Sequence, residues 1–227
     1  MRFTMPQFWK VRREMTRIAD QFLAVPTFIA EVLWYEALHM FSRRQPRRYP
    51  GQQVAGKDVA IFLLYQPGGI LASTVETCRH LVEQGYSIRI ISNAPVSEVD
   101  RGRLAPYCQT IIERQNHGYD FGGYQFAINE LLTEEVVPEN LLLINDSIWF
   151  PVLTKCDLLQ RLRSSAADFS GPVIYRHRKE KKTHLQSYML HFRQSAIVHP
   201  AFRNFWSNYR KSSSKRWTIR YGEMRLT

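Results

Sequence analysis

ENLLLINDSIWFPV, residues 139–152, is the stretch that decides the fold. Its apolar run Leu141–Ile144 leads directly into the polar triplet Asn145, Asp146 and Ser147. A strand that is apolar throughout is typical of a parallel sheet covered on both faces, and open sheets of this kind bind ligands at the carboxyl ends of their strands. The stretch therefore predicts a buried parallel strand that delivers Asp146 to a binding site.

A glycine-rich turn upstream is expected to form the second wall of that site. It lies in ERQNHGYDFGGYQFAINELL, residues 113–132. Glycines such as Gly118 permit positive φ and close backbone approach, and the N-terminus of a following helix favours anions. Asn116 and Asp120 are then placed to hydrogen-bond a base or a ribose. The alternative is that Asp120 acts only as the N-cap of the helix.

Apolar segments on either side alternate between strand and helix patterns, which predicts β-α-β units. We expect strands at 59–65, 87–92, 110–113 and 141–144, with helices at 71–84, 123–132, 158–165 and 201–209. Residues 51–227 are therefore predicted to form one α/β domain with a mostly parallel, Rossmann-like sheet flanked by helices.

Residues 1–50 are expected to form an amphipathic helical arm and a basic linker, the linker extending over 45–57. The longest apolar stretch of the arm, 22–35, is too short to span a bilayer. Basic flanks and the interfacial residues Trp9 and Trp34 are typical of a helix on a membrane surface. The same apolar stripe fits packing on the domain or on a second subunit equally well.

The formal charge of +11 is unevenly distributed, because both ends are basic and residues 51–170 are acidic. This pattern suits anionic lipid or phosphorylated ligands. We find no nucleic-acid-binding signature, so nucleic acid is not an expected partner. Cys78, Cys108 and Cys156 lack metal-ligand or redox spacing, which fits a reducing cytosol. We expect a cytoplasmic protein that makes peripheral contact with the inner face of the cell membrane.

Asp146 is the main candidate for chemistry. A carboxylate at a strand end can bind a divalent ion together with the phosphates of a ligand. The alternative is that its side chain caps the following turn. His184 is either a base or donor in the pocket, or a histidine satisfied in the core. The basic run 176–182 is either a solvated loop or a contact for diphosphate or anionic lipid.

Several motifs together resemble the rhamnan synthesis protein F family, bacterial glycosyltransferases of cell-surface polysaccharide assembly that are associated with rhamnose transfer. The matching elements, in order, are Arg114, Asn116, Gly118–Gly122, Leu142–Ser147, His184–Tyr188 and Phe205–Trp206. The resemblance covers roughly residues 59–210. It implies a GT-A-like fold, a nucleotide-sugar donor and a glycan or lipid-linked glycan acceptor. Compared with the family, the C-terminal portion is expected to be cut short.

The resemblance places Asn145-Asp146-Ser147 where many GT-A enzymes carry an Asp-X-Asp metal motif. A second acidic residue is missing here, so Mg²⁺ or Mn²⁺ at Asp146 is an expectation that needs a test. We expect catalytic roles for Asp146, Asp168 and His184, with Asp168 or Asp120 as general base. The expected nucleotide-sugar-binding residues are Tyr65, Asn93, Arg114, Asn116, Gly118, Asp120, Asn145, Ser147 and Gln186.

The sequence therefore predicts a hexosyltransferase that moves a sugar from a nucleotide-diphosphate donor to a bacterial cell-surface polysaccharide or lipopolysaccharide. The missing acidic residue and the short C-terminus favour an alternative, a non-catalytic subunit that binds sugar-nucleotide or glycan within an assembly complex.

Overall fold

The computed structural model describes residues 12, 15, 16, 26, 29, 30, 33, 34, 37, 45–153, 155–177, 182–212, 215–218, 221–222 and 224–226. Its contacts divide the chain into two units, Met1–Arg43 and Arg44–Thr227. The described residues of the first unit are helical, but most of the expected arm lies outside the described residues. The division at residue 50 and the membrane contact of the arm stay predictions. None of the helices described is both long and apolar enough to cross a membrane.

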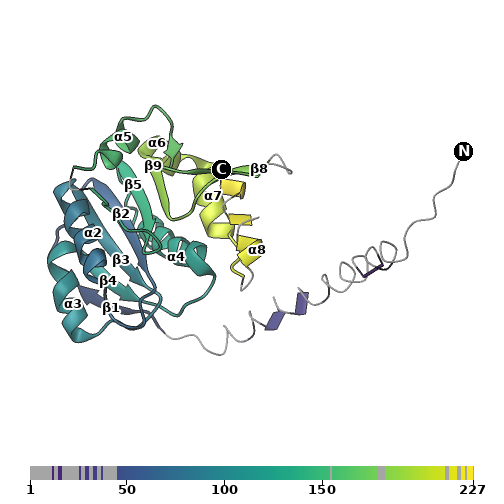
Figure 1. Cartoon of the computed structure of the whole chain (residues 1–227), viewed down its shortest axis with the longest axis horizontal. Coiled ribbons are helices and arrows are strands. Elements are labelled where there is room, and N and C mark those ends of the chain that lie inside the picture. The colour runs from purple at the N-terminus through teal and green to yellow at the C-terminus, as the bar shows by residue number, and fades with distance from the viewer. Residues whose placement is uncertain are drawn as a thin grey trace, which may run out of the picture. The chain divides into compact units, whose positions relative to one another are not determined.

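The second unit is built on a seven-stranded sheet with the order β1-β4-β3-β2-β5-β9-β6 (Figure 1). Its four central strands run parallel to one another: β4 (Thr110–Glu113), β3 (Tyr86–Ser92), β2 (Asp58–Leu64) and β5 (Asn140–Asn145). The expected α/β class with a mostly parallel sheet is thus confirmed. The four predicted strands agree with these bounds to within a residue or so.

Helices cover both faces of the sheet (Figure 1). On one face lie α2 (Ala72–Glu83), α3 (Glu98–Leu104) with the short helix η1 (Ala105–Tyr107), and α5 (Leu158–Ser164). On the other lie α4 (Tyr119–Thr133), α6 (Gln194–Val198) and α7 (Pro200–Asn208). The side chains of β2 alternate between the two cores, with Ile61 and Leu63 facing α4 and Phe62 facing α2. Each face of a pleated strand thus buries its own apolar layer.

Antiparallel strands complete the sheet. The strand β9 (Met189–Arg193) pairs with β5, and β6 (Phe169–Ser170) pairs with β9. The strands β7 (Ile174–His177) and β8 (Lys182–Leu185) form a separate hairpin. Two short helices, α8 (Lys215–Thr218) and α9 (Met224–Leu226), follow α7. Residues 178–181 of the predicted basic run lie outside the described residues.

Two expectations about the chain were wrong. Residues 45–57 are not all linker, because β1 (Arg47–Pro50) pairs antiparallel with β4 at the sheet edge. Pro50 is tolerated there because an edge strand leaves one row of backbone groups unpaired. Helix α4 begins at Tyr119 rather than at residue 123, since Gly118 at φ 83° already turns the chain into the helix.

Candidate functional site

The candidate site lies at the carboxyl edge, by which we mean the edge of the sheet where β2, β3, β4 and β5 end. The chain runs from β2 outward to β3 and β4, and then returns to the other side of β2 as β5. Connections therefore leave β2 and β5 in opposite directions. Ligands of open α/β sheets bind at this kind of switch point.

Asp146 spans that switch point. Its carboxylate Oδ2 accepts a hydrogen bond of 2.8 Å from the backbone N–H of Tyr65, which follows β2. The backbone N–H of Asp146 donates to Leu63 at 3.2 Å. The two strand ends are thus joined by the carboxylate, and no ion pair to Asp146 is found among the described residues.

The expected alternative role of Asp146 as a turn cap is performed by Asn145 instead. The Oδ1 atom of Asn145 accepts from the backbone N–H of Ser147 at 3.0 Å, and its Nδ2 donates to Asp120 Oδ2 at 2.8 Å. Asn145 is buried, whereas Ser147 is exposed. Asn145 therefore both closes the turn and connects it to α4.

Asp120 lies in the first turn of α4 and is not its N-cap. That position belongs to Gly118, which has no side chain to accept a bond. The start of α4 packs closely on the loop before it, because a Cβ at Gly122 would lie 2.0 Å from the carbonyl oxygen of His117. This close packing places the Asp120 carboxylate beside Asn145 and next to Asp146.

A second polar pair joins the ends of β3 and β4. Arg114 donates to Asn93 Oδ1 at 2.5 Å and to the carbonyl oxygen of His117 at 2.9 Å. Asn93 and His117 are buried. Asn116 is exposed on the loop between β4 and α4. Arg114 thus holds the loop that presents Asn116 and Gly118, and Asn116 is directed to solvent rather than to the protein.

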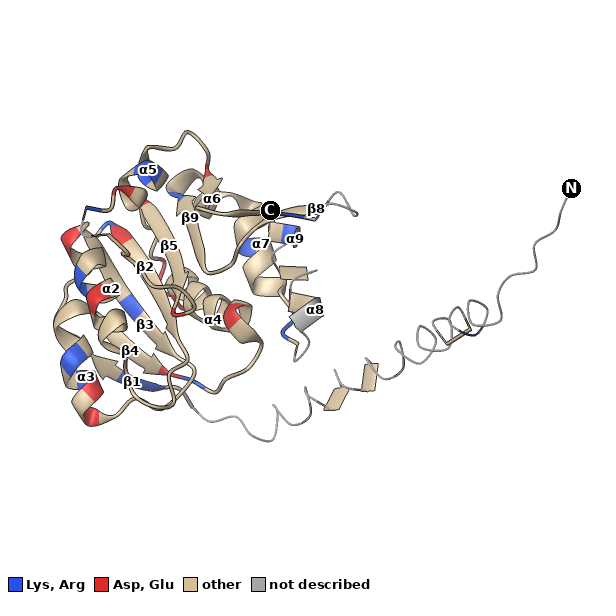
Figure 2. Ribbon diagram, viewed as in Figure 1, with Lys and Arg blue, Asp and Glu red and all other residues tan. Residues whose placement is uncertain are grey.

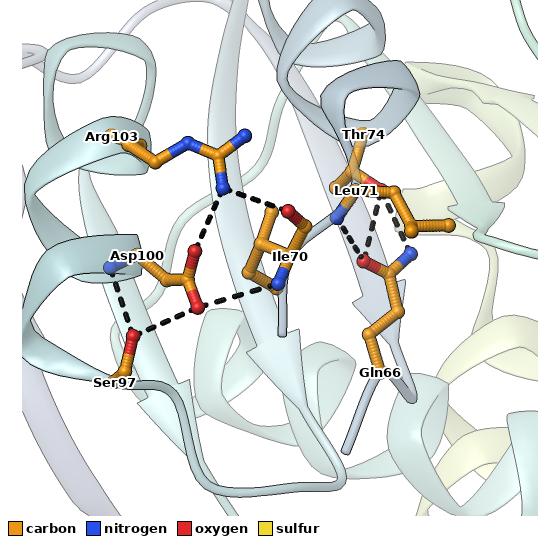
Figure 3. Close-up of polar contacts among 7 residues, drawn as sticks. All are labelled: Gln66, Ile70, Leu71, Thr74, Ser97, Asp100 and Arg103. Atoms are coloured by element: carbon orange, nitrogen blue, oxygen red, sulfur yellow. Dashed lines mark hydrogen bonds and ion pairs between the residues drawn. The ribbon is translucent and has the colours of Figure 1, made fainter. Parts of the chain in front are cut away.

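The loop after β2 is fixed by side chains from two helices (Figure 3). Gln66 Oε1 accepts from the backbone N–H of Leu71 at 3.0 Å. Leu71 is the N-cap residue of α2, and its own side chain makes no capping hydrogen bond. Asp100 Oδ2 accepts from the backbone N–H of Ile70 and from Ser97 Oγ. These bonds, that of Ser97 foremost, lower the pKa of the Asp100 carboxyl. The loop behind Tyr65 is therefore rigidly held.

The motif His184–Tyr188 reaches the carboxyl edge through β8 and β9. Tyr188 accepts from the backbone N–H of Asn145 at 3.1 Å, and Tyr124 of α4 donates to the carbonyl oxygen of Ser187 at 3.1 Å. His184 is buried, with its Nε2 3.5 Å from Gln186 Nε2. The turn at Ser187 and Tyr188 therefore lies beside Asn145 and α4, and His184 and Gln186 precede it in the chain.

Asp168 is the predicted catalytic residue that the structure does not bring to the site. Its carbonyl oxygen accepts from Arg193, which is paired with Asn140 at the amino end of β5. Asp146 lies six residues further along that direction, or roughly 20 Å away at about 3.3 Å per residue. Asp168 therefore lies at the opposite edge of the sheet, where it accepts from Ser195 Oγ at 2.5 Å.

The sequence analysis did not identify the residues of α4 that contact the motif Phe205–Trp206. Gln125 donates to the carbonyl oxygens of Trp206 at 2.8 Å and of Tyr209 at 2.7 Å, and so closes the end of α7. The ring of Phe121 stacks on Trp206, with centroids 5.7 Å apart. The spacing of Phe121 and Gln125 on one helical face was the available signal, since residues four apart in a helix point the same way.

The oxygen groups at this edge suit a hard divalent ion. Mg²⁺ and Mn²⁺ prefer carboxylates, water and substrate phosphates, and one or two protein carboxylates suffice. Asp146 and Asp120 supply such oxygens. Within the described part of the chain, no group of three or more His, Cys, Asp or Glu side chains is placed to hold a metal. An ion at this edge would be held by these carboxylates together with the phosphates of a ligand.

The model of the rhamnan synthesis protein F family matches residues 88–227. An uncharacterized protein of Sinorhizobium fredii, y4gN, is 37% identical over 223 residues, which are 96% of this chain and 57% of that protein. The chain thus spans little more than half the length of this relative.

Among solved structures, the chain is similar to the mannosyltransferase PcManGT from Pyrobaculum calidifontis, described in complex with GDP-Man and Mn²⁺. The match has a TM-score of 0.39 and 10% identity, and it covers 77% of this chain and 55% of that one. The family match covers well over half of the chain and includes α4, β5 and the Asp146 turn, and the chain therefore belongs to the rhamnan synthesis protein F family.

Proposed function

We propose that the protein is a glycosyltransferase that moves a sugar, with rhamnose as the first candidate, from a nucleotide-diphosphate donor to a bacterial cell-surface polysaccharide. Family membership supports a glycosyltransferase-like function in polysaccharide synthesis. The observation that carries the proposal is the position of Asp146, a carboxylate without an ion-pair partner among the described residues, at the switch point between β2 and β5.

In this proposal Asp146 acts at the donor diphosphate. A divalent ion bound there would stabilise the negative charge that develops on the leaving diphosphate. Tyr65 contributes its backbone N–H to orient the Asp146 carboxylate. Arg114 positions the loop that carries Asn116, and exposed Asn116 then hydrogen-bonds the nucleotide.

Asp120 becomes the proposed general base, because Asp168 lies at the other edge of the sheet. A base must reach the acceptor hydroxyl within hydrogen-bond distance. Asp120 Oδ2 accepts from Asn145 Nδ2 at 2.8 Å, which holds the carboxylate beside the Asp146 turn. His184 and Gln186 are proposed to line the acceptor side of the same edge.

Calorimetric titration of dTDP, UDP and GDP, each with and without Mg²⁺ or Mn²⁺, tests the donor site. We would compare wild type with Asp146→Ala and with a control, Asp157→Ala. Asp157 is an exposed carboxylate paired with Arg161 on α5. We expect one nucleotide to bind selectively, with affinity at least about tenfold weaker in Asp146→Ala and unchanged in the control. Equal binding by all three proteins would remove Asp146 from the site.

The second candidate function is a non-catalytic subunit that binds sugar-nucleotide or glycan. It is favoured by the single carboxylate in the Asn145-Asp146-Ser147 triplet. Such a subunit would bind the nucleotide without turning over its sugar. A donor-hydrolysis assay on the same protein separates the two functions, since a transferase commonly releases sugar slowly to water.

A further inference from the structure

A groove runs along helix α7, on the side away from the core. It consists of a cavity of about 510 Å³ and a second of about 290 Å³, which share Ala201, Phe205 and Arg225 in their linings. The two cavities adjoin at these shared residues, and we call them together the α7 groove. The larger cavity alone falls within the roughly 300–1,000 Å³ of small-molecule sites.

The sequence of α7 separates a groove face from a core face. Ala201, Asn204, Phe205 and Asn208 recur at helical spacing and border the groove. Trp206, on the other face, is buried in the core, while Phe202 is buried and also borders the smaller cavity. The smallest of these side chains, Ala201, borders both cavities.

Aromatic rings form one wall of the groove. Tyr209, at the end of α7, faces Trp217 of α8 and Tyr221 across the larger cavity. The rings of Trp217 and Tyr221 lie 3.8 Å apart at 32°, and Trp217 Nε1 donates to the carbonyl oxygen of Arg210 at 3.3 Å. The wall is therefore built of broad ring surfaces that are held in place.

Amide and guanidinium groups border the same cavity. Asn208 Nδ2 donates to Asn204 Oδ1 at 2.7 Å. This bond leaves the Asn204 nitrogen as a donor and the Asn208 oxygen as an acceptor for a ligand. Arg225 is exposed and adds a further donor. Rings beside neutral amides suit a ligand with apolar faces and many hydroxyls, and a sugar ring has both.

The groove connects the two edges of the sheet. At one end Tyr209 accepts from Gln125 of α4, and Lys211 lies close enough that a Cβ at Gly118 would be 3.0 Å from its side chain. This end therefore adjoins the carboxyl edge and its Asp120. At the other end the smaller cavity is bordered by Asp168 and Ser195. Helices α7 and α8, which border the groove, lie one after the other on this side of the molecule (Figure 2).

We propose that the α7 groove binds the acceptor glycan as a chain of several sugar rings, with the ring to be extended at the Tyr209 end. The inference rests on the proposed transferase function and adds a site to it. The groove is longer than a single ring needs, because the nine residues of α7 alone span about 14 Å. The larger cavity combines aromatic rings and two amides with the guanidinium groups of Arg210 and Arg225, and the rings favour a glycan over a polyphosphate.

The test fills the groove at its middle. Ala201→Leu places a bulky side chain at the junction of the cavities, and Ser207→Leu places the same side chain on the exposed surface of α7 outside them. Binding of short rhamnose, mannose and N-acetylglucosamine oligosaccharides would be measured by calorimetry on wild type and both variants. Nucleotide binding would be measured on the same samples, and circular dichroism would verify that each variant is folded.

We expect wild type and Ser207→Leu to bind one class of oligosaccharide equally, and Ala201→Leu to bind it about tenfold more weakly with nucleotide binding unchanged. Equal oligosaccharide binding by Ala201→Leu and wild type would overturn the groove proposal, and so would failure of wild type to bind any of the three. Either result with nucleotide binding intact contradicts the groove proposal but not the proposed donor site. Absence of nucleotide binding with oligosaccharide binding intact contradicts the donor site but not the groove.

Discussion

The two edges of the sheet hold the same kinds of polar residue but pair them differently. At the amino edge, the Asp58 carboxylate accepts from Asn140 Nδ2 at 2.8 Å and from Arg163 at 3.2 Å. Asn140 Oδ1 lies 3.1 Å from Nε2 of His191, whose other nitrogen lies 3.4 Å from Ser170 Oγ. The charge of Asp58 is thus neutralised by a neighbouring guanidinium within a connected network.

At the carboxyl edge, Asp146 accepts from a backbone N–H and has no ion-pair partner among the described residues. At the same edge, Arg114 is engaged by Asn93 and by the carbonyl oxygen of His117 instead. A carboxylate with its own cation stabilises the fold, whereas one held only by backbone retains its charge for a ligand. The comparison therefore supports the carboxyl edge as the proposed binding site.

The substitution Asp146→Asn tests most directly whether the carboxyl edge differs in function from the amino edge. The amide oxygen can still accept from the Tyr65 N–H, so the fold should persist, but the negative charge is lost. We expect sugar transfer to fall by about 100-fold or more, the size of effect that follows loss of one electrostatic group at a reacting centre. Initial rates with the donor that binds best would measure it, and thermal unfolding should match wild type. Transfer at the wild-type rate would place the chemistry elsewhere.

The amino edge predicts a different response, in stability and with pH. Burial lowers the pKa of His191 to about 4 from an ordinary 6.5. Between these two pH values, His191 is protonated in the unfolded chain but neutral in the folded chain. The contribution of neutral His191 to the free energy of unfolding is therefore full above pH 6.5 and is lost as the pH falls toward 4. The loss is about 3 kcal/mol at 1.36 kcal/mol per pKa unit.

Urea unfolding of wild type and His191→Asn between pH 7.5 and pH 4 would measure this dependence. The difference between the two curves isolates the histidine, because the carboxyl groups are common to both. We expect wild type to lose more stability than the variant on acidification. Parallel curves would mean that His191 does not titrate differently in the folded and unfolded chain.

The sequence allowed β5, the glycine turn and the parallel sheet to be predicted, because these depend on local patterns. An apolar run before Asn145 and a glycine before a helix are visible without knowing the partner strands. β1 was missed because its strand character comes from pairing with β4, some 60 residues away. Asp168 was misplaced because β9 runs antiparallel to β5, and the local pattern does not contain that direction.

The close packing at the start of α4 is the next point to test. In Gly122→Ala the new methyl group meets the His117 carbonyl oxygen, which also accepts from Arg114. We expect a loss of about 2 kcal/mol in the free energy of unfolding, typical of overpacking. Gly102→Ala is the control, since no atom lies within 4 Å of its Cβ position on α3, and it should gain up to about 1 kcal/mol.

Urea denaturation with both glycine variants gives the comparison directly. A neutral Gly122→Ala would show that the loop before α4 can move away without cost. The contact would then not be what holds Asp120 and Asn116 in place.

The smallest expected effect is that of Asp168→Asn, and it decides whether the two edges are separate in function. At roughly 20 Å from Asp146, Asp168 cannot reach a hydroxyl that attacks a sugar held there, and so kcat should stay within about twofold of wild type. Its carboxylate borders the far end of the α7 groove, where an acceptor chain would lose one hydrogen bond at most. A modest rise in the acceptor KM with an unchanged kcat is therefore the expected result, while Asp120→Asn should lower kcat itself. If Asp168→Asn instead abolished kcat and Asp120→Asn did not, the general base would lie at the amino edge, and the carboxyl edge would retain only the donor.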